Sequence, residues 1–350
     1  VTLNGALTVS SGSFTLNNTA NLIQTTNVSN SGNIIVKRNS SAIMRLDYTL
    51  WCSPVSGSQT LLNFSPNTLV DRFYEYNSST DEYNSVVPST TTFGLAKGYL
   101  IRVRNAFPTT PTVWPGTFTG VPNNGNITYA MASGFNAVGN PYPSRLNVAD
   151  FIDGNTATTG TLYFWRKSNN AANTSYATVT KIAYTANSAA GGDTGTGFFN
   201  TGDEANWVIN IGQGFLVEST SATNLSYTNS MRRSSNSNQF FRQDQNQTLV
   251  ANPSVYWLNM TNTTGTFSQA AVGYTEDATN GVDRGIDGKN INQDFYLSSL
   301  IGAEAYSIQG RSSFEASDVV PLTYKVLAAG SYTIAIDHST GLFSDGQRVF

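Results

Sequence analysis

The chain consists of many short apolar and aromatic stretches separated by turn residues. Residues 72–76, 98–103 and 214–217 are rich in the aromatic and aliphatic residues that favour strands. No segment keeps a helical period with caps over several turns, and residues 148–152 suffice for one short turn of helix. Thirty glycines and 11 prolines, spread along the chain, supply the turns. This pattern predicts an all-β protein.

The first 38 residues are built differently from the rest. Their strand-like pieces are only a few residues long and recur at near-regular intervals, with Gly or Asn between them. Such spacing is typical of the rungs of a β-solenoid. We therefore predict a short β-solenoid-like segment over residues 1–38, with a pair of hairpins as the alternative. A solenoid that begins at residue 1 has no cap, which predicts further sequence upstream.

Residues 41–132 and 133–242 share a weak internal duplication. Each copy has a strand that ends in a Pro turn, then an aromatic strand, then a strand in which Gly98 or Gly214 precedes an aromatic residue. We predict two related β-sandwich-like units over these ranges. Residues 249–350 alternate well and predict a C-terminal β-sandwich. We expect this last domain to be truncated, because the chain stops within a strand-like stretch.

Six short motifs stand out along the chain: GNPYP at 139–143, LYFW at 162–165, GQGF at 212–215, YWLNM at 256–260, VDRGID at 282–287 and GSYTI at 330–334. Together they resemble large extracellular proteins of Bacteroidetes such as flavobacteria. The resemblance implies export by the type IX secretion system, a place outside the cell or on its outer surface, and a β-rich modular build. It implies no reaction, because such regions accompany many different passengers. The C-terminal sorting domain of such proteins is not recognisable here.

The composition agrees with an extracellular protein. Charged residues make up 12% of the chain, about half the usual share, and Asn, Ser, Thr and Gly replace them. A net charge of −3 with 19 dispersed basic residues offers no basic face, which excludes nucleic acid as a partner. Arg232 and Arg233, at the start of a polar linker over 232–248, are expected in a solvated loop. No apolar run approaches the roughly 20 residues of a membrane span.

The sequence offers few candidate catalytic residues. The single cysteine, Cys52, lies in an apolar run and is expected to be a buried small hydrophobe. Nucleophilic chemistry with a histidine base would depend on His338 alone, which we expect in a surface turn. A glycosidase needs only two carboxylates, but no pattern pairs two of the 22 acidic residues across a cleft. We therefore expect a protein that is not an enzyme, with a glycoside hydrolase as the alternative.

Calcium is the one cofactor that the sequence suggests. Asp277, Asp283 and Asp287 lie in a loop rich in Gly and Asn, and oxygen-rich loops bind hard cations. The spacing does not match an EF-hand. The alternative is a structural loop in which Arg284 and Lys289 pair with the acids. We expect no cofactor, with calcium at these three aspartates as the candidate exception.

Aromatic residues on strands suggest contact with sugars. Tyr74, Tyr76 and Trp165 are the leading candidates for stacking on sugar rings, with Tyr83 and Tyr163 as further candidates. Aromatic residues also fill β-sandwich cores routinely. Our first hypothesis is a non-enzymatic structural or adhesive surface protein that assembles with itself into a layer or fibre through unpaired strand edges. The alternative is a glycan-binding module of a larger secreted protein. The expected partners are further copies of the chain or surface glycans, and the secretion machinery during export.

Overall fold

A computed structural model describes residues 1–165, 175–186, 204–234 and 253–349 of the chain. Strands make up most of its regular structure, so the prediction of an all-β protein is confirmed. The helical turn expected at 148–152 is α2, which Asn147 caps by accepting the amide of Asp150. The described helices and 3-10 turns are α1 (Leu61–Phe64), α2 (Val148–Asp153), η1 (Glu204–Asn206), η2 (Asn229–Met231) and η3 (Gly341–Phe343).

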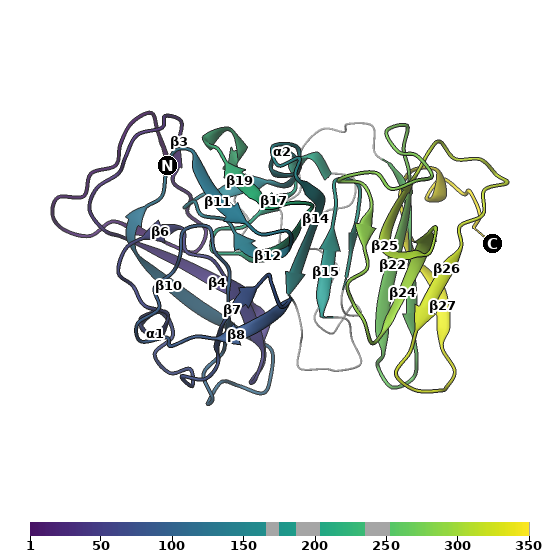
Figure 1. The fold of residues 1–350 in the computed structure, drawn as a ribbon, viewed down its shortest axis with the longest axis horizontal. Coiled ribbons are helices and arrows are strands. Elements are labelled where there is room, and N and C mark those ends of the chain that lie inside the picture. Colours follow the sequence, from purple (N-terminus) through teal and green to yellow (C-terminus); the bar gives the residue numbers. More distant parts are fainter. Residues whose placement is uncertain (166–174, 187–203, 235–252, 350) are drawn as a thin grey trace. The chain divides into compact units, whose positions relative to one another are not determined.

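The chain forms two compact units, and each unit combines two separate segments. The first unit contains Val1–Thr158 and Trp207–Asp244, and the second contains Thr159–Asn206 and Gln245–Phe350 (Figure 1). The four-part division drawn from the sequence follows chain order, whereas these units do not. Most of the linker proposed over 232–248 lies outside the described residues.

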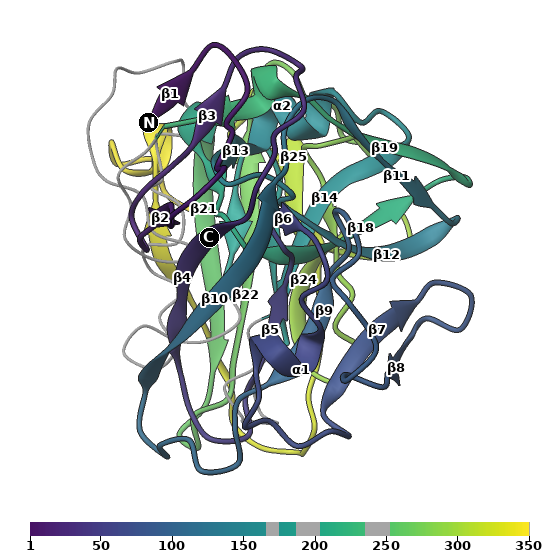
Figure 2. The same ribbon diagram turned by 90° about the vertical axis from the view of Figure 1, so that its left-hand side faces the viewer.

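The first unit contains several small sheets around an aromatic core. Its two longest strands, β4 and β10, lie side by side and alternate buried and more exposed residues along most of their length (Figure 2). In the core, the ring of Phe64 stacks on Phe118 at 4.7 Å and meets Trp51 edge-on at 5.2 Å. The sheets run β2-β4-β10-β6, β5-β9-β7-β8, β17-β13-β20, β11-β19 and β1-β3, and β12 pairs with β18. The bounds are β1 (Thr2–Leu3), β2 (Thr15–Leu16), β3 (Ile23–Gln24), β4 (Ile34–Ile43), β5 (Tyr48–Trp51), β6 (Val55–Ser56), β7 (Phe73–Asn77), β8 (Glu82–Ser85), β9 (Tyr99–Arg102), β10 (Thr112–Pro122), β11 (Ile127–Met131), β12 (Gly134–Gly139), β13 (Arg145–Asn147), β17 (Val208–Ile209), β18 (Gly214–Ser219), β19 (Thr223–Tyr227) and β20 (Arg232–Arg233).

The N-terminal segment does not form the predicted solenoid. Residues 1–38 make short parallel contacts, with β1 on β3 and β2 on β4, each over two residues. The chain then enters the long strand β4, which pairs antiparallel with β10. The backbone around Leu22 bonds to the rest of the first unit: its amide donates to Pro143 and its carbonyl accepts from Arg232. Within the described ranges no further rungs stack on this segment, because its backbone bonds to the rest of the first unit and β4 pairs antiparallel with β10.

The internal duplication reappears as a repeated pattern of strand pairing. In the first copy β5 pairs antiparallel with β9, and β7 forms a hairpin with β8. In the second copy β12 pairs antiparallel with β18 in the first unit, and β14 (Thr158–Trp165) forms a hairpin with β15 (Tyr176–Val179) in the second.

The two copies also contact each other through equivalent residues. The Cys52 amide donates to the Gly212 carbonyl at 2.9 Å, and the Gly139 amide donates to the Ala96 carbonyl at 3.0 Å. Ala96 and Gly212, the two acceptors, both have positive φ, at 58° and 81°. Because each bond joins one copy to the matching position of the other, the contact has local two-fold symmetry.

The glycines of the duplicated motif are required by this close approach. A Cβ atom on Gly98 would lie 2.9 Å from the carbonyl oxygen of Val138. A Cβ atom on Gly214 would lie 2.7 Å from Cγ of Leu50. The strands can therefore meet only where the side chain is missing, which explains why both copies place Gly before an aromatic residue.

The second unit is built on a single seven-stranded half-barrel and not on the β-sandwich predicted for residues 249–350. Its strand order is β26-β24-β25-β22-β21-β27, and β23 also pairs with β25. Alternation along β21 sends Val255 and Trp257 to one face, where they join Ile308 in a core cluster. Strands β14, β15 and β16 belong to this unit, and the indole of Trp257 donates to the Tyr184 carbonyl on β16 at 2.7 Å. The bounds are β16 (Tyr184–Thr185), β21 (Ser254–Thr261), β22 (Phe267–Tyr274), β23 (Gly288–Lys289), β24 (Tyr296–Ile301), β25 (Glu304–Arg311), β26 (Leu322–Lys325) and β27 (Thr333–Ser339).

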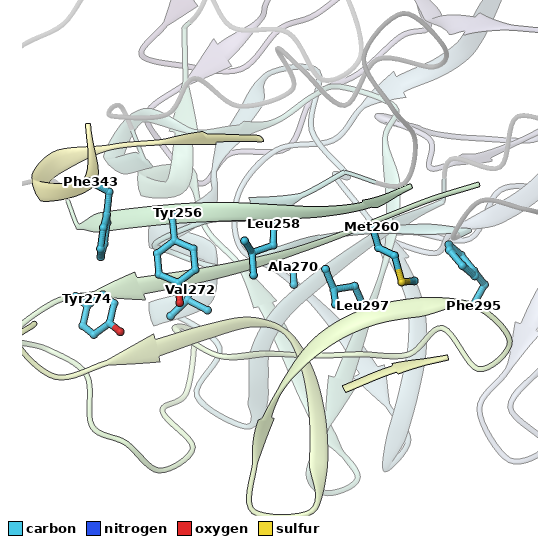
Figure 3. Packing of buried hydrophobic residues seen from close by; sticks show 9 residues of the cluster. All are labelled: Tyr256, Leu258, Met260, Ala270, Val272, Tyr274, Phe295, Leu297 and Phe343. Atoms are coloured by element: carbon cyan, nitrogen blue, oxygen red, sulfur yellow. The ribbon is translucent and has the colours of Figure 1, made fainter. Parts of the chain in front are cut away.

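The opposite face of the half-barrel carries a second hydrophobic cluster. Tyr256, Leu258 and Met260 of β21 point to this side, together with Val272 and Tyr274 of β22. Figure 3 shows the cluster as one row of side chains, with Phe343 and Tyr274 at one end and Met260 and Phe295 at the other. Partly buried residues of connecting segments, among them Phe314 and Val320, pack against this cluster.

Candidate binding surfaces

An apolar groove opens on the face of the half-barrel that carries this second cluster. Its cavity has a volume of about 560 Å³, which is large enough for a small ligand or for several side chains of a partner. Tyr256, Leu258 and Tyr274 of the cluster line it, together with residues of the 314–320 segment and of β26 and β27.

Two polar side chains that line this groove, Asp318 and Tyr274, bind each other, and Asp318 also binds Arg311. Asp318 accepts from Nε and Nη2 of Arg311, both at 2.5 Å, and from the hydroxyl of Tyr274 at 2.8 Å. The Arg311 guanidinium lowers the pKa of Asp318, while burial raises the pKa of Tyr256 to about 12. At neutral pH the pair therefore stays charged and the phenols stay protonated. This arrangement suits the binding of an apolar group better than proton transfer.

The half-barrel ends in two edge strands, β26 and β27, which follow each other in the chain. Among the described strands, β26 pairs only with β24, and β27 pairs only with β21. Residues 333–337 of β27 are all exposed, and Ile334 and Ile336 are 45% and 49% exposed where they line the groove. On β26, Leu322 is 41% exposed and Tyr324 62%. Exposed apolar residues on an unpaired strand edge are a template for pairing with another strand.

A row of half-buried tyrosines forms a second surface, in the first unit. Tyr74 and Tyr76 lie two residues apart on β7, and Tyr83 of β8 stands directly opposite Tyr76. The rings of Tyr76 and Tyr83 are 5.0 Å apart, and Tyr48 of β5 lies 5.9 Å from Tyr74. The third predicted stacking residue, Trp165, belongs to the second unit, where its ring packs on Tyr176 at 5.2 Å. The structure therefore joins Tyr74 and Tyr76 with two further tyrosines, and Trp165 is not part of this row.

The three predicted calcium ligands do not share one position. Asp287 is 4% exposed, and its carboxylate accepts the amides of Asp283 at 2.5 Å and Gly310 at 2.6 Å. Asp283 accepts the amide and hydroxyl of Thr279, while Asp277 is exposed. Burial raises the pKa of Asp287 to about 6. In the part of the chain that the structure describes, no group of three acidic, His or Cys side chains is placed to hold a metal. Calcium binding stays a prediction.

Three further residues are placed as follows. Cys52 is fully buried, as predicted, and burial raises its thiol pKa well above the ordinary value. His338 lies within β27 and not in a turn, and its ring stacks on Trp257 at 4.1 Å. The expectation of a solvated Arg232 is wrong, because this side chain is 5% exposed. It donates to the Ser144 hydroxyl and the Asn124 side chain and lies over the Tyr142 ring at 4.6 Å. It also donates to the Leu22 carbonyl at 2.6 Å, which ties the N-terminal segment to the first unit.

Sequence reasoning named Tyr83 as a candidate without placing it beside Tyr76, and it missed Tyr48 and the edge position of β27. The register of the β7–β8 hairpin would have placed Tyr83 beside Tyr76, since a short turn connects the two strands. Tyr48 joins the row through β9, whose pairing with β5 and β7 is not visible in the local pattern. The alternation of residues 333–337 predicts a strand but does not indicate whether that strand is paired on both sides.

The chain belongs to the family described as a domain of unknown function, DUF8693, whose model matches residues 1–350. No curated protein and no solved structure matches the chain. None of the helices in the described ranges is long and apolar enough to cross a bilayer.

Proposed function

We propose that this chain is a non-enzymatic structural or adhesive protein that associates with a second copy of itself through the edge strand β27. The observation that carries the proposal is a strand edge that no other described strand pairs with, and that carries two exposed isoleucines beside an apolar groove. The resemblance to secreted surface proteins of Bacteroidetes supports a location outside the cell, where lateral association would build a layer or fibre.

The sequence of β27 suits antiparallel pairing with its own copy. Centred on Ala335, such a pair places Ile334 of one copy opposite Ile336 of the other, on the groove face. On the other face, Asp337 stands opposite Thr333, so no like charges face each other. A two-fold contact of this kind uses the same patch twice and is the commonest form of association between identical chains.

The exposed apolar area sets the strength of the contact. The exposed fractions of Ile334, Ile336, Leu322, Tyr324 and Val319 amount to between two and three whole side chains per copy. Covering them in both copies contributes about 8 to 16 kcal/mol, at about 1.5 to 3 kcal/mol for each side chain. Association costs about 4 to 15 kcal/mol. The balance favours weak, reversible association, which higher local concentration at a surface would strengthen.

Analytical ultracentrifugation over a range of protein concentrations tests the proposal. Wild type should show a reversible dimer or larger species, and Ile336→Lys should remain a monomer, because a charge on an edge strand opposes pairing. Val282→Lys is the matched control, since Val282 is 64% exposed in the same unit but lies outside β27. A monomeric wild type at all concentrations, or an Ile336→Lys variant that associates like the control, would refute self-association through β27.

A further inference from the structure

The tyrosine row lies on one face of the sheet β5-β9-β7-β8. The opposite face of this sheet is buried in the core of the first unit, where Phe73, Trp51 and Ile101 are inaccessible. Tyr83, Tyr76, Tyr74 and Tyr48 cross the sheet from β8 to β5, and all four rings are partly exposed. Adjacent strands are about 4.8 Å apart, so the row extends over about 14 Å. It offers a succession of aromatic surfaces to an elongated ligand.

A buried arginine, two of whose nitrogens have no acceptor among the described residues, lies next to this row. Arg102 stands directly opposite Tyr48 in the pairing of β9 with β5, and its side chain is on the same face. The residue is 7% exposed, and its Nε and Nη2 atoms are buried without a hydrogen-bond partner among the described residues. Buried donors are almost always satisfied in folded proteins, so a missing acceptor is expected here.

Arg311 shows which acceptor fits that edge of a guanidinium. In the second unit, the same two atoms of Arg311, Nε and Nη2, bind the two oxygens of Asp318 at 2.5 Å each. A carboxylate is the planar, two-oxygen group that matches this pair of donors. The nearby Arg72 is paired with Asp71 at 2.7 Å, so the second arginine of this corner already has its anion. The unused charge is that of Arg102.

We propose that this face binds an acidic oligosaccharide, with sugar rings on the tyrosines and a sugar carboxylate on the Nε and Nη2 edge of Arg102. The proposal is independent of self-association through β27, because it concerns the other unit. Since the two nitrogens are buried, binding requires Tyr48 or another covering side chain to turn aside. Tyrosine suits this contact because its ring packs on the apolar face of a sugar. The hydroxyls of Tyr74 and Tyr76 donate to the Asp71 carbonyl and the Asp81 carboxylate, which fixes the orientation of these two rings.

Calorimetric titration with a galacturonic acid trimer tests the inference, with the neutral galactose trimer as the charge control. Wild type should bind the acidic trimer and bind the neutral one at least about tenfold more weakly. Arg102→Met should lose that preference and remain folded, because an apolar side chain in place of a buried, unpartnered charge is well tolerated. Tyr76→Ala, at a partly exposed position, should weaken the binding of both trimers.

Tyr324→Ala is the matched control, since Tyr324 is a more exposed tyrosine outside the row. Binding that is lost in Arg102→Met and Tyr76→Ala but kept in Tyr324→Ala supports the assignment. No binding of either trimer, equal binding of both, or an Arg102→Met variant that keeps its preference for the acidic trimer would overturn it. Thermal unfolding of each variant shows whether a loss reflects the site or the fold, and the Tyr76→Ala result decides if Arg102→Met does not fold.

Discussion

Replacing Asp287 by Asn should change how the stability of the second unit depends on pH. Asp287 is buried, and its two carboxylate oxygens accept the amides of Asp283 and Gly310, which tie the 283–287 loop to β25. Burial raises its pKa from 3.8 to about 6 despite these two donors. The native state therefore holds a proton between these two pH values that the unfolded state has already released.

The sign and size of the effect follow from this difference. Where the native state binds more protons than the unfolded state, the free energy of unfolding falls as the pH rises. A difference of about two pKa units corresponds to about 3 kcal/mol, so wild type should lose up to that much between pH 4 and pH 7 through this residue. Asparagine cannot titrate, and its amide group would face one of the two N–H donors. Asp287→Asn should therefore be less stable than wild type at pH 4, and the difference should shrink towards pH 7.

Urea unfolding at pH 4, 5, 6 and 7, monitored by hydrogen-exchange mass spectrometry, measures this difference in stability. Peptides of β25 report it next to Asp287. Asp277→Asn is the matched control, because Asp277 lies in the same loop but is exposed. The other acids of the unit contribute equally to wild type and variant, so their effects cancel in the comparison. A stability difference between wild type and Asp287→Asn that stays constant, or that grows as the pH rises, would show that burial does not control the protonation of Asp287.

Two further predictions concern the contact between the duplicated motifs and the acidic loop. Gly139→Ala would place a Cβ atom 2.2 Å from Cβ of Cys52 and 2.7 Å from the Gln213 carbonyl oxygen, so we expect a loss of about 3 kcal/mol or more in urea unfolding. Gly5→Ala, where a Cβ would meet nothing within 4 Å, should be near neutral, and equal effects of the two substitutions would contradict this reasoning. Calcium should leave the thermal unfolding of wild type unchanged, because both oxygens of Asp287 already accept amides. A calcium-dependent rise in Tm that Asp283→Asn abolishes would instead establish the site that the sequence suggests.

Local properties of the chain were predictable from the sequence. Alternation and turn residues define an all-β protein, since these features act over a few neighbouring residues. The apolar run around Cys52 placed this thiol in the core, and the repeated Gly-aromatic motif revealed the duplication. The reason for that motif, a contact too close for a Cβ atom at Gly98 and Gly214, became visible only in the structure.

The tertiary structure alone decided which strands pair and which stay open. The N-terminal segment was predicted to be a solenoid because its strands are short and regular, but β4 finds an antiparallel partner in β10, more than 60 residues away. Arg232 lies in a polar stretch of the sequence, which predicts exposure. Its burial is possible because Leu22, Asn124 and Ser144, all distant in sequence, supply acceptors for its guanidinium. Likewise, alternation in β27 specifies two faces, but β27 is an edge because β21 is its only partner among the strands that the structure describes. Periodicity determines which way a side chain points, whereas partners distant in sequence determine what it meets.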